Sequence, residues 1–209
     1  MKNDLDIDPD IEIQYQNMEA RFSWEQIFGN TEPVEIEIGF GKCAFLIAIA
    51  RDRPTVNFVG IEVSRKYYRK GLNKIQRAEM PNVKLLYGEA FYIFKRFVPD
   101  ESITNLYINC PDPWPKKRHA KRRLFSPSFI EEAARTLIPC GCIDIATDVA
   151  FYMKDTLEVF QACEAYQKVY ALTHDELNGQ RRYFSEYEQQ FLQSGKTMYY
   201  ARFKKVMSV

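Results

Sequence analysis

The sequence contains few of the residues that build metal sites. It has two histidines and five cysteines in 209 residues, and no two of these cysteines have CxxC spacing. Structural and catalytic zinc sites need three or four such ligands at characteristic spacings. We therefore expect no metal site. Because the cysteine count is odd, reduced thiols in a cytosol are the simplest interpretation.

Long apolar runs are also missing. No stretch is long enough to cross a bilayer, and the N-terminus is acidic, whereas a signal peptide begins with positive charge. We expect a cytoplasmic protein without a membrane partner, and nothing indicates an obligatory protein partner. Lysine and arginine number 29 and aspartate and glutamate 28, a net charge of +1. Any cluster of one sign is therefore a local feature of the surface.

The one acidic cluster lies at the start of the chain, where Asp4, Asp6, Asp8, Asp10 and Glu12 precede any clear strand. Such a segment is typical of a terminus that packs little. We expect residues 1–30 to form an acidic extension that is partly mobile. Residues 31–209 have the length and apolar content of a single domain.

Within that domain, short apolar runs alternate with helical patterns. Strands are predicted at residues 34–38, 56–63, 83–87, 103–109, 141–147 and 198–206. Helices are predicted at residues 42–51, 64–79, 90–97, 127–137 and 151–162. Repeated β-then-α units favour an α/β fold with a parallel, doubly wound sheet. Ligands bind such sheets at the carboxyl ends of the strands.

Carboxylates and glycines are predicted at that edge. Gly39 and Gly41 follow the first strand, Glu37 ends it, and Glu62 and Glu89 lie at the ends of the next two. An acidic residue about 20 positions after the glycines suits a ribose diol. Glu37 would repel the pyrophosphate of a nicotinamide dinucleotide, whereas S-adenosylmethionine carries cations and no phosphate. The pattern therefore favours a methyltransferase over a NAD-dependent dehydrogenase.

The most informative stretch runs from Cys110 to Arg123. Three prolines at 111, 113 and 115 hold Asp112 and Trp114 in a stiff turn. A block of cations follows at once: Lys116, Lys117, Arg118, Lys121, Arg122 and Arg123. A carboxylate beside a phosphate-seeking segment indicates chemistry on a nucleic acid. Trp114 could stack on a base or anchor the loop.

The motifs EIGFG, GIEVSR, GEA, PDPWPKKRH, ATD and SEYE occur in this order. From about Pro33 to the C-terminus the chain resembles the bacterial tRNA (guanine-N7)-methyltransferases. This resemblance implies a Rossmann-like class I methyltransferase fold, mostly parallel with an antiparallel C-terminal strand. It also implies RNA binding and methyl transfer from S-adenosyl-L-methionine to N7 of a guanine in the variable loop of tRNA.

The resemblance also implies roles for particular residues. Asp112 would be catalytic and would contact the cofactor together with Glu37, Gly39, Gly41, Glu62 and Glu89. The substrate contacts would be Lys116, Lys117, Arg118, Lys121, Arg122, Arg123, Asp148, Ser185, Glu186, Tyr187 and Glu188. The chain departs from the family pattern at four places. Cys43 replaces a glycine, Glu89 an aspartate, Glu186 a lysine, and Val149-Ala150 a Trp-Glu pair.

Three alternatives stay open. The protein could be an RNA-binding module with a vestigial cofactor pocket, although Glu37, Gly39, Gly41 and Glu62 are all present. Asp148 could cap the helix that follows it. The helix at 64–79 carries five cations, Lys66, Arg69, Lys70, Lys74 and Arg77. It could extend an RNA surface, but a solvated helix face is the simpler interpretation.

Overall fold

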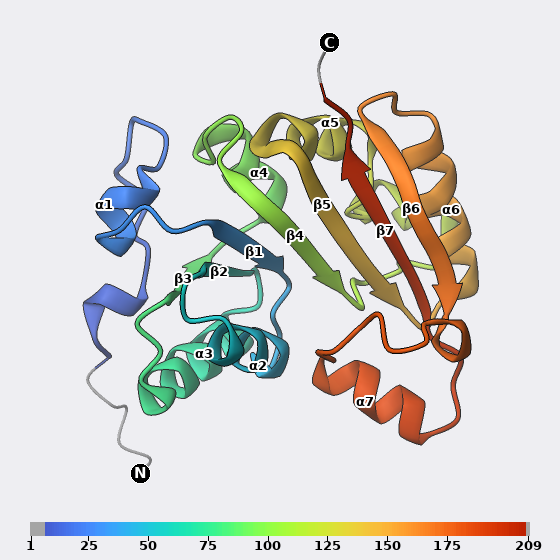
Figure 1. Ribbon diagram of the computed structural model, residues 1–209, viewed down its shortest axis with the longest axis horizontal. Helices are drawn as coiled ribbons and strands as arrows, with labels where there is room; N and C mark the ends of the chain where they lie inside the picture. Colours follow the sequence, from blue (N-terminus) through green and yellow to red (C-terminus); the bar gives the residue numbers. More distant parts are fainter. Residues whose placement is uncertain (1–6, 208–209) are drawn as a thin grey trace.

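Seven strands form one sheet in the order β3-β2-β1-β4-β5-β7-β6 (Figure 1). They are seen in a computed structural model that describes residues 7–207. The strands are β1 (Val34–Ile38), β2 (Asn57–Glu62), β3 (Val83–Tyr87), β4 (Ile103–Asn109), β5 (Leu137–Thr147), β6 (Tyr166–Thr173) and β7 (Tyr199–Lys205). Four consecutive pairings, from β3 to β5, are parallel, and only β7 runs against its neighbours. The predicted mostly parallel fold with an antiparallel C-terminal strand is confirmed.

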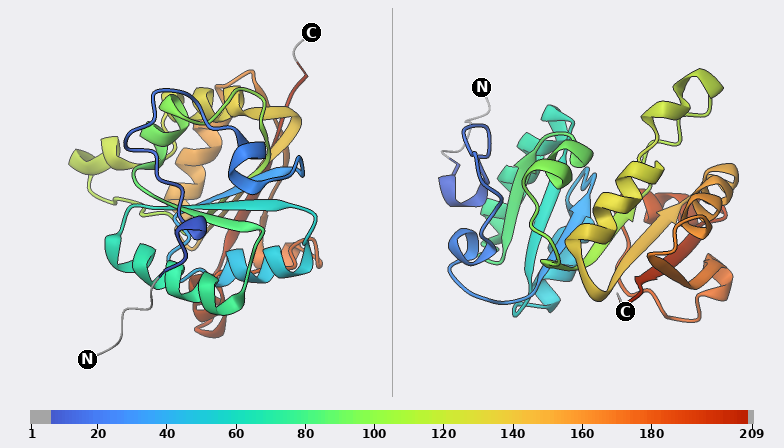
Figure 2. Two further views of the ribbon diagram at one scale, coloured as in Figure 1. Left: turned by 90° about the vertical axis from the view of Figure 1, so that its left-hand side faces the viewer. Right: turned by 90° about the horizontal axis from the view of Figure 1, so that it is seen from above.

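Helices cover both faces of this sheet. They are α1 (Trp24–Phe28), α2 (Ala44–Asp52), α3 (Arg65–Ala78), α4 (Ala90–Arg96), α5 (Pro127–Thr136), α6 (Ala150–Gln161) and α7 (Glu186–Gln193). Three short 3-10 helices are η1 (Pro9–Ile11), η2 (Lys117–Arg122) and η3 (His174–Glu176). In the left panel of Figure 2, α4, α5 and α6 lie above the sheet, and α2 and α3 lie below it. Helices on both faces explain why every residue of β1 and β2 is buried, the glutamates of β1 included.

The sequence analysis missed strand β6 and helices α1 and α7, together with the three short 3-10 helices. Strand β6 forms the edge of the sheet, and only Tyr166 among its residues is fully buried. Its apolar and polar residues do not alternate regularly, so it lacks the pattern of a half-buried strand. Helix α7 has the clearer signal, because Ser185 and Glu188 have the spacing of a capping box and form one.

The strand order reverses between β2 and β4, which both pair with β1. Neighbouring crossovers leave a crevice at such a switch point. Phe40, in the turn after β1, packs into space left by two glycines. A Cβ at Gly60 would lie 2.7 Å from the Phe40 ring, and one at Gly71 would lie 2.6 Å from it. The small residues on β2 and α3 therefore let Phe40 hold the turn in place.

The described part of the acidic extension, residues 7–30, packs on the domain. The Ile13 N–H donates to the Leu85 carbonyl over 2.9 Å, and Phe22 donates to the Phe97 carbonyl over 2.8 Å. Ile13, Tyr15 and Phe22 are buried in the core that underlies β1 and β4. These residues thus belong to the same folded unit as residues 31–207. The predicted mobility of the first six residues lies outside the described part of the chain.

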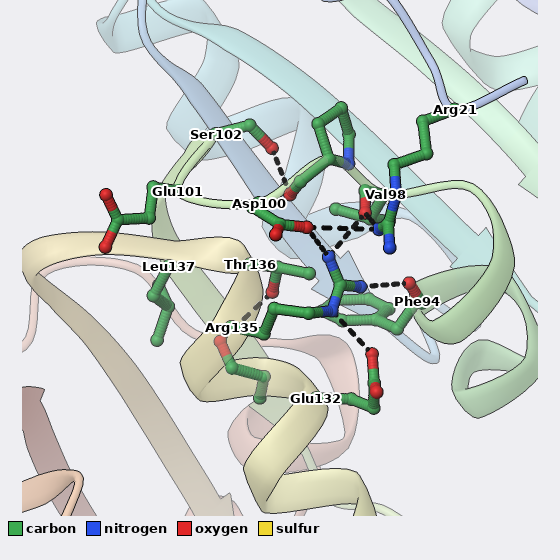
Figure 3. Close-up of polar contacts among 12 residues, drawn as sticks. Arg21, Phe94, Val98, Asp100, Glu101, Ser102, Glu132, Arg135, Thr136 and Leu137 are labelled. Carbon is green, nitrogen blue, oxygen red and sulfur yellow. Dashed lines mark hydrogen bonds and ion pairs between the residues drawn. The ribbon is translucent and has the colours of Figure 1, made fainter.

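Arg135, at the end of α5, connects this N-terminal segment to the rest of the domain (Figure 3). Its guanidinium donates to the carbonyls of Phe94 and Val98 and pairs with Asp100 and Glu132. Arg21 reaches the same Asp100 over 3.3 Å. One carboxylate therefore joins two distant segments at the amino edge of the sheet, away from the switch point.

Candidate active site

The glycine turn after β1 forms the centre of the candidate site. Gly39 and Gly41 have φ angles of 74° and 50°, which favour glycine. Glu62, at the end of β2, fixes this turn through both carboxylate oxygens. Oε2 accepts from the Gly41 N–H over 2.9 Å, and Oε1 accepts from the Ser64 N–H over 2.8 Å. A carboxylate can accept about four hydrogen bonds, so Glu62 keeps capacity for a ligand.

Glu37, at the end of β1, is a buried carboxylate with one unsatisfied oxygen. Its side chain is 1% exposed, and Oε1 accepts from the Asn109 amide over 2.9 Å. Oε2 is buried and has no hydrogen-bond partner among residues 7–207. Burial raises the pKa of Glu37 to about 8, although the Asn109 hydrogen bond lowers it. An unpartnered buried oxygen of this kind suits a cationic or donor group of a ligand.

A chain of buried polar groups continues from Glu37 to helix α7. Arg181 donates to the Asn109 Oδ1 over 2.6 Å and pairs with Glu188 over 2.9 Å. Glu188 is fully buried and accepts from the Ser185 N–H over 2.7 Å. Glu188 thus holds α7 from inside the protein. The sequence analysis had instead predicted that Glu188 contacts the substrate.

Two more contacts place α7 over the glycine turn. The Lys42 ammonium lies 2.6 Å from the Glu186 carboxylate, and the hydroxyls of Tyr67 and Tyr187 lie 3.1 Å apart. A Cβ on Gly41 would lie 3.8 Å from the Tyr187 ring. The SEYE segment therefore lines the same small pocket as Glu37, Gly39 and Gly41. It was predicted to contact the substrate, and the structure places it beside the predicted cofactor residues.

Glu89 lies at the end of the next strand along this edge. It is the N-cap of α4, where its carboxylate accepts from the N–H groups of Phe91 and Tyr92 over 2.9 and 2.7 Å. Glu37, Glu62 and Glu89 therefore follow one another across three adjacent strands, in the order the sequence predicts. Glu89 is exposed, whereas the other two are buried.

The proline-rich turn follows β4, beside the glycine turn. Asp112 is exposed and forms no hydrogen bond with the described residues. Arg123 holds this turn in place. Its guanidinium donates to the carbonyls of Pro113 and Trp114 over 3.1 and 3.2 Å and to Asp155 over 2.6 Å. The structure thus engages Arg123 inside the protein, in contrast to its predicted role as an RNA contact.

The other cations of the block extend along η2. Lys116, Arg118, Lys121 and Arg122 are exposed, and none pairs with a carboxylate of residues 7–207. Lys117 begins η2. The Arg122 guanidinium lies 4.9 Å from the centre of the Trp114 ring, and His119 packs edge-on to that ring at 5.6 Å. Trp114 therefore packs against its own loop, and stacking on a base stays a prediction.

Asp148 lies after β5 and pairs with Lys196 over 3.1 Å. It does not cap α6, because Val149 is the N-cap residue and no side chain bonds there. The sequence analysis missed Lys196, Lys42, Asn109 and Arg181. Asn109 could have been found, since it is a polar residue at a strand end. Arg181 lies in a stretch without periodicity, so its partners could not be inferred.

Among residues 7–207, no group of three His, Cys, Asp or Glu side chains could hold a metal ion. The helices of that range are too short or too polar to span a membrane.

Comparison with known proteins identifies the family of the chain. Residues 31–201 match the family model described as "Putative methyltransferase". A tRNA (guanine-N(7)-)-methyltransferase from Thermotoga maritima is 34% identical over 93% of the chain and 61% of its own length. The enzyme of that name from Streptococcus gordonii is 33% identical over 87% of the chain and 85% of its own length.

A solved structure supports the fold. The 16S rRNA methyltransferase KamB superposes with a TM-score of 0.64 at 14% identity, over 90% of this chain and 95% of its own. At that identity the likeness shows the architecture alone. The family model covers the glycine turn, the proline-rich turn and the α7 segment together, and the curated relatives match most of the chain at 33–34% identity. The chain belongs to the tRNA (guanine-N7)-methyltransferase family.

Proposed function

We propose that this protein transfers a methyl group from S-adenosyl-L-methionine to N7 of a guanine in the variable loop of tRNA. One observation carries the proposal. A single edge of the sheet holds buried carboxylates around a glycine turn and, after the neighbouring strand, an exposed carboxylate followed by unpaired cations. The curated relatives bear the name of this activity.

The residues present fit the cofactor. The unsatisfied Glu37 Oε2 would accept from its ammonium group, and the spare lone pairs of Glu62 would accept from its ribose hydroxyls. Glu89 would lie on the adenine side, since it ends the strand beyond Glu62. The positive φ angles at Gly39 and Gly41 let a ligand approach the backbone closely. When bound, the cofactor supplies an activated methyl group.

Guanine N7 has a lone pair and no proton, so no residue has to act as a base toward it. The chain must instead position the base and stabilise the positive charge that the ring gains. Asp112 is suited to the second task because it is exposed, has no hydrogen-bond partner among residues 7–207 and sits on a turn held by Arg123. The target base must leave its stack, which costs a few kcal/mol.

The cations of η2 would bind phosphates next to the target base without reading sequence. Lys116, Arg118 and Lys121 are exposed and lack carboxylate partners among the described residues, so they are available for this role. Asp148 and the exposed Tyr187 would complete the substrate side, at the ends of β5 and α7 that face the turn.

Methyl transfer from labelled cofactor to unmodified tRNA tests the proposal. Borohydride reduction followed by aniline cleavage cuts the chain at N7-methylguanine, so the cut should fall in the variable loop. A cut at another guanine would support the methyltransferase activity and contradict the proposed position in the variable loop. No label in tRNA, with normal binding of the cofactor by calorimetry, would contradict the activity itself.

A further inference from the structure

The N-terminal half of α3 is a second cationic surface beside the site. We propose that Arg65, Lys66, Arg69 and Lys70 bind the phosphate backbone of the tRNA substrate, on the side of the cofactor pocket opposite η2. This inference rests on the proposed function, because it assumes tRNA as the substrate.

The helix carries an unusual charge. Six of its 14 residues are lysine or arginine, and none is acidic. All six cations are exposed, and none forms an ion pair with a carboxylate in residues 7–207. Arginines elsewhere behave differently, since Arg53, Arg181 and Arg202 all pair with buried carboxylates. The helix thus keeps its charges available for an external partner.

This arrangement costs helix stability. Arg65 and Arg69, and likewise Lys66 and Lys70, are like charges four positions apart, and such pairs destabilise a helix. Cations in the first turn also oppose the helix dipole, which favours negative charge there. No described carboxylate offsets these terms. A polyanion lying along the helix would offset them.

The surface adjoins the pocket directly. Ser64, the residue before α3, donates its N–H to Glu62, and Tyr67 in the first turn contacts Tyr187 above Gly41. Strands β2 and β4 flank β1, so their carboxyl ends lie about 10 Å apart, two strand spacings. Helix α3 begins three residues after β2, and η2 begins eight residues after β4, beyond the proline-rich turn. In the left panel of Figure 2, the η2 loop and the start of α3 both project to the left. A single RNA could therefore contact both surfaces while its base enters between them.

The C-terminal half of α3 has a different environment. There the Asp8 N–H donates to Gln76 over 3.2 Å, which brings the acidic N-terminal segment against the last two turns. Glu79, the C-cap residue of α3, adds a further carboxylate two positions after Arg77. The phosphate-binding surface is accordingly confined to the four cations of the first two turns.

The test compares two variants with the same change in net charge. One replaces Arg65, Lys66, Arg69 and Lys70 with glutamine, which preserves helix propensity. The control replaces Lys95, Arg96, Lys168 and Lys204 with glutamine. These four are also exposed, but lie at the end of α4 and at the opposite edge of the sheet. The affinity for unmodified tRNA is measured across a salt series, and cofactor affinity by calorimetry.

Each lost phosphate contact lowers the slope of log affinity against log salt by about 0.7–0.9. We expect the slope of the α3 variant to be smaller than that of the wild type by roughly 2–3, which corresponds to about three or four lost phosphate contacts. The control should keep the wild-type slope, and both variants should bind the cofactor normally. Equal slopes in the two variants would overturn the inference and leave the proposed function intact. If the wild-type protein itself neither binds nor methylates tRNA, the proposed function fails, and this inference fails with it.

Discussion

At the scale of single residues, the environment of Glu37 gives it an unusual protonation state. Burial raises its pKa from 4.5 to about 8, so the folded protein holds a proton that the unfolded chain has lost. The stability that Glu37 contributes is therefore complete below pH 4.5 and is lost as pH rises through about 8. The Glu37→Gln variant lacks this titration. We expect the unfolding free energy of the wild type to fall, relative to the variant, between pH 5 and 8.

Denaturant unfolding at several pH values measures this difference. Glu158→Gln is a suitable control, because Glu158 is 65% exposed and its ion pair with Lys154 is long, at 4.0 Å. If the stability difference between the wild type and Glu37→Gln does not change with pH, Glu37 is charged in the folded protein.

Asp112 differs from Glu37 because solvent reaches it and no side chain in the described part of the chain pairs with it. Its substitution by asparagine preserves the shape of the turn and removes the charge. If the carboxylate stabilises the positive charge of the reacting guanine, single-turnover methyl transfer should fall about 100-fold or more. Affinity for tRNA should change little. A normal single-turnover rate would limit Asp112 to a structural role in the turn.

At the scale of elements, α7 depends on one buried ion pair. Glu188 is fully buried and Arg181 has 8% of its side chain exposed. Removing one partner leaves the other charge buried and alone, which typically costs 3–5 kcal/mol. We expect Arg181→Met to destabilise the protein by about that amount, and to weaken cofactor binding because Asn109 then loses its link to α7.

Arg182 provides the matched control one position along the chain. It also pairs with a carboxylate, Asp52, over 2.9 Å, but 77% of its side chain is exposed. Arg182→Met should therefore cost less than about 1 kcal/mol. Equal losses of stability in the two variants, measured by denaturant unfolding, would show that burial does not decide the strength of the Arg181 pair.

At the scale of the whole molecule, the N-terminal segment supports the cofactor edge. The Tyr15 hydroxyl donates to the Tyr87 carbonyl over 3.0 Å, just before Gly88 and Glu89. A Cβ at Gly88 would lie 2.2 Å from that hydroxyl. We expect Gly88→Ala to destabilise the protein by about 1–3 kcal/mol through overpacking. The cost should be smaller when Tyr15→Phe removes the oxygen.

A double-mutant cycle measured by thermal or denaturant unfolding checks this coupling. Additive effects of Gly88→Ala and Tyr15→Phe would mean that the segment does not press on the GEA loop in solution. Tyr15→Phe alone should cost only about 1 kcal/mol, the value of one hydrogen bond.

The sequence by itself determined the fold and the kind of site. Alternating β and α patterns predicted the parallel sheet, because period and apolar content depend on local residues. The glycines and carboxylates at strand ends predicted the pocket for the same reason. A parallel sheet brings all such ends to one edge, so Glu37, Glu62 and Glu89 needed no further information to be grouped.

Only the tertiary structure decided which polar groups meet. Arg181, Lys42 and Asn109 are distant in sequence from their partners, and a buried charge selects a partner by geometry that no local pattern encodes. The same holds for Arg123, which belonged to a basic block by sequence but bonds to Trp114 and Asp155. It holds also for residues 7–30, whose apolar side chains gain their stabilisation from a core formed by the rest of the chain.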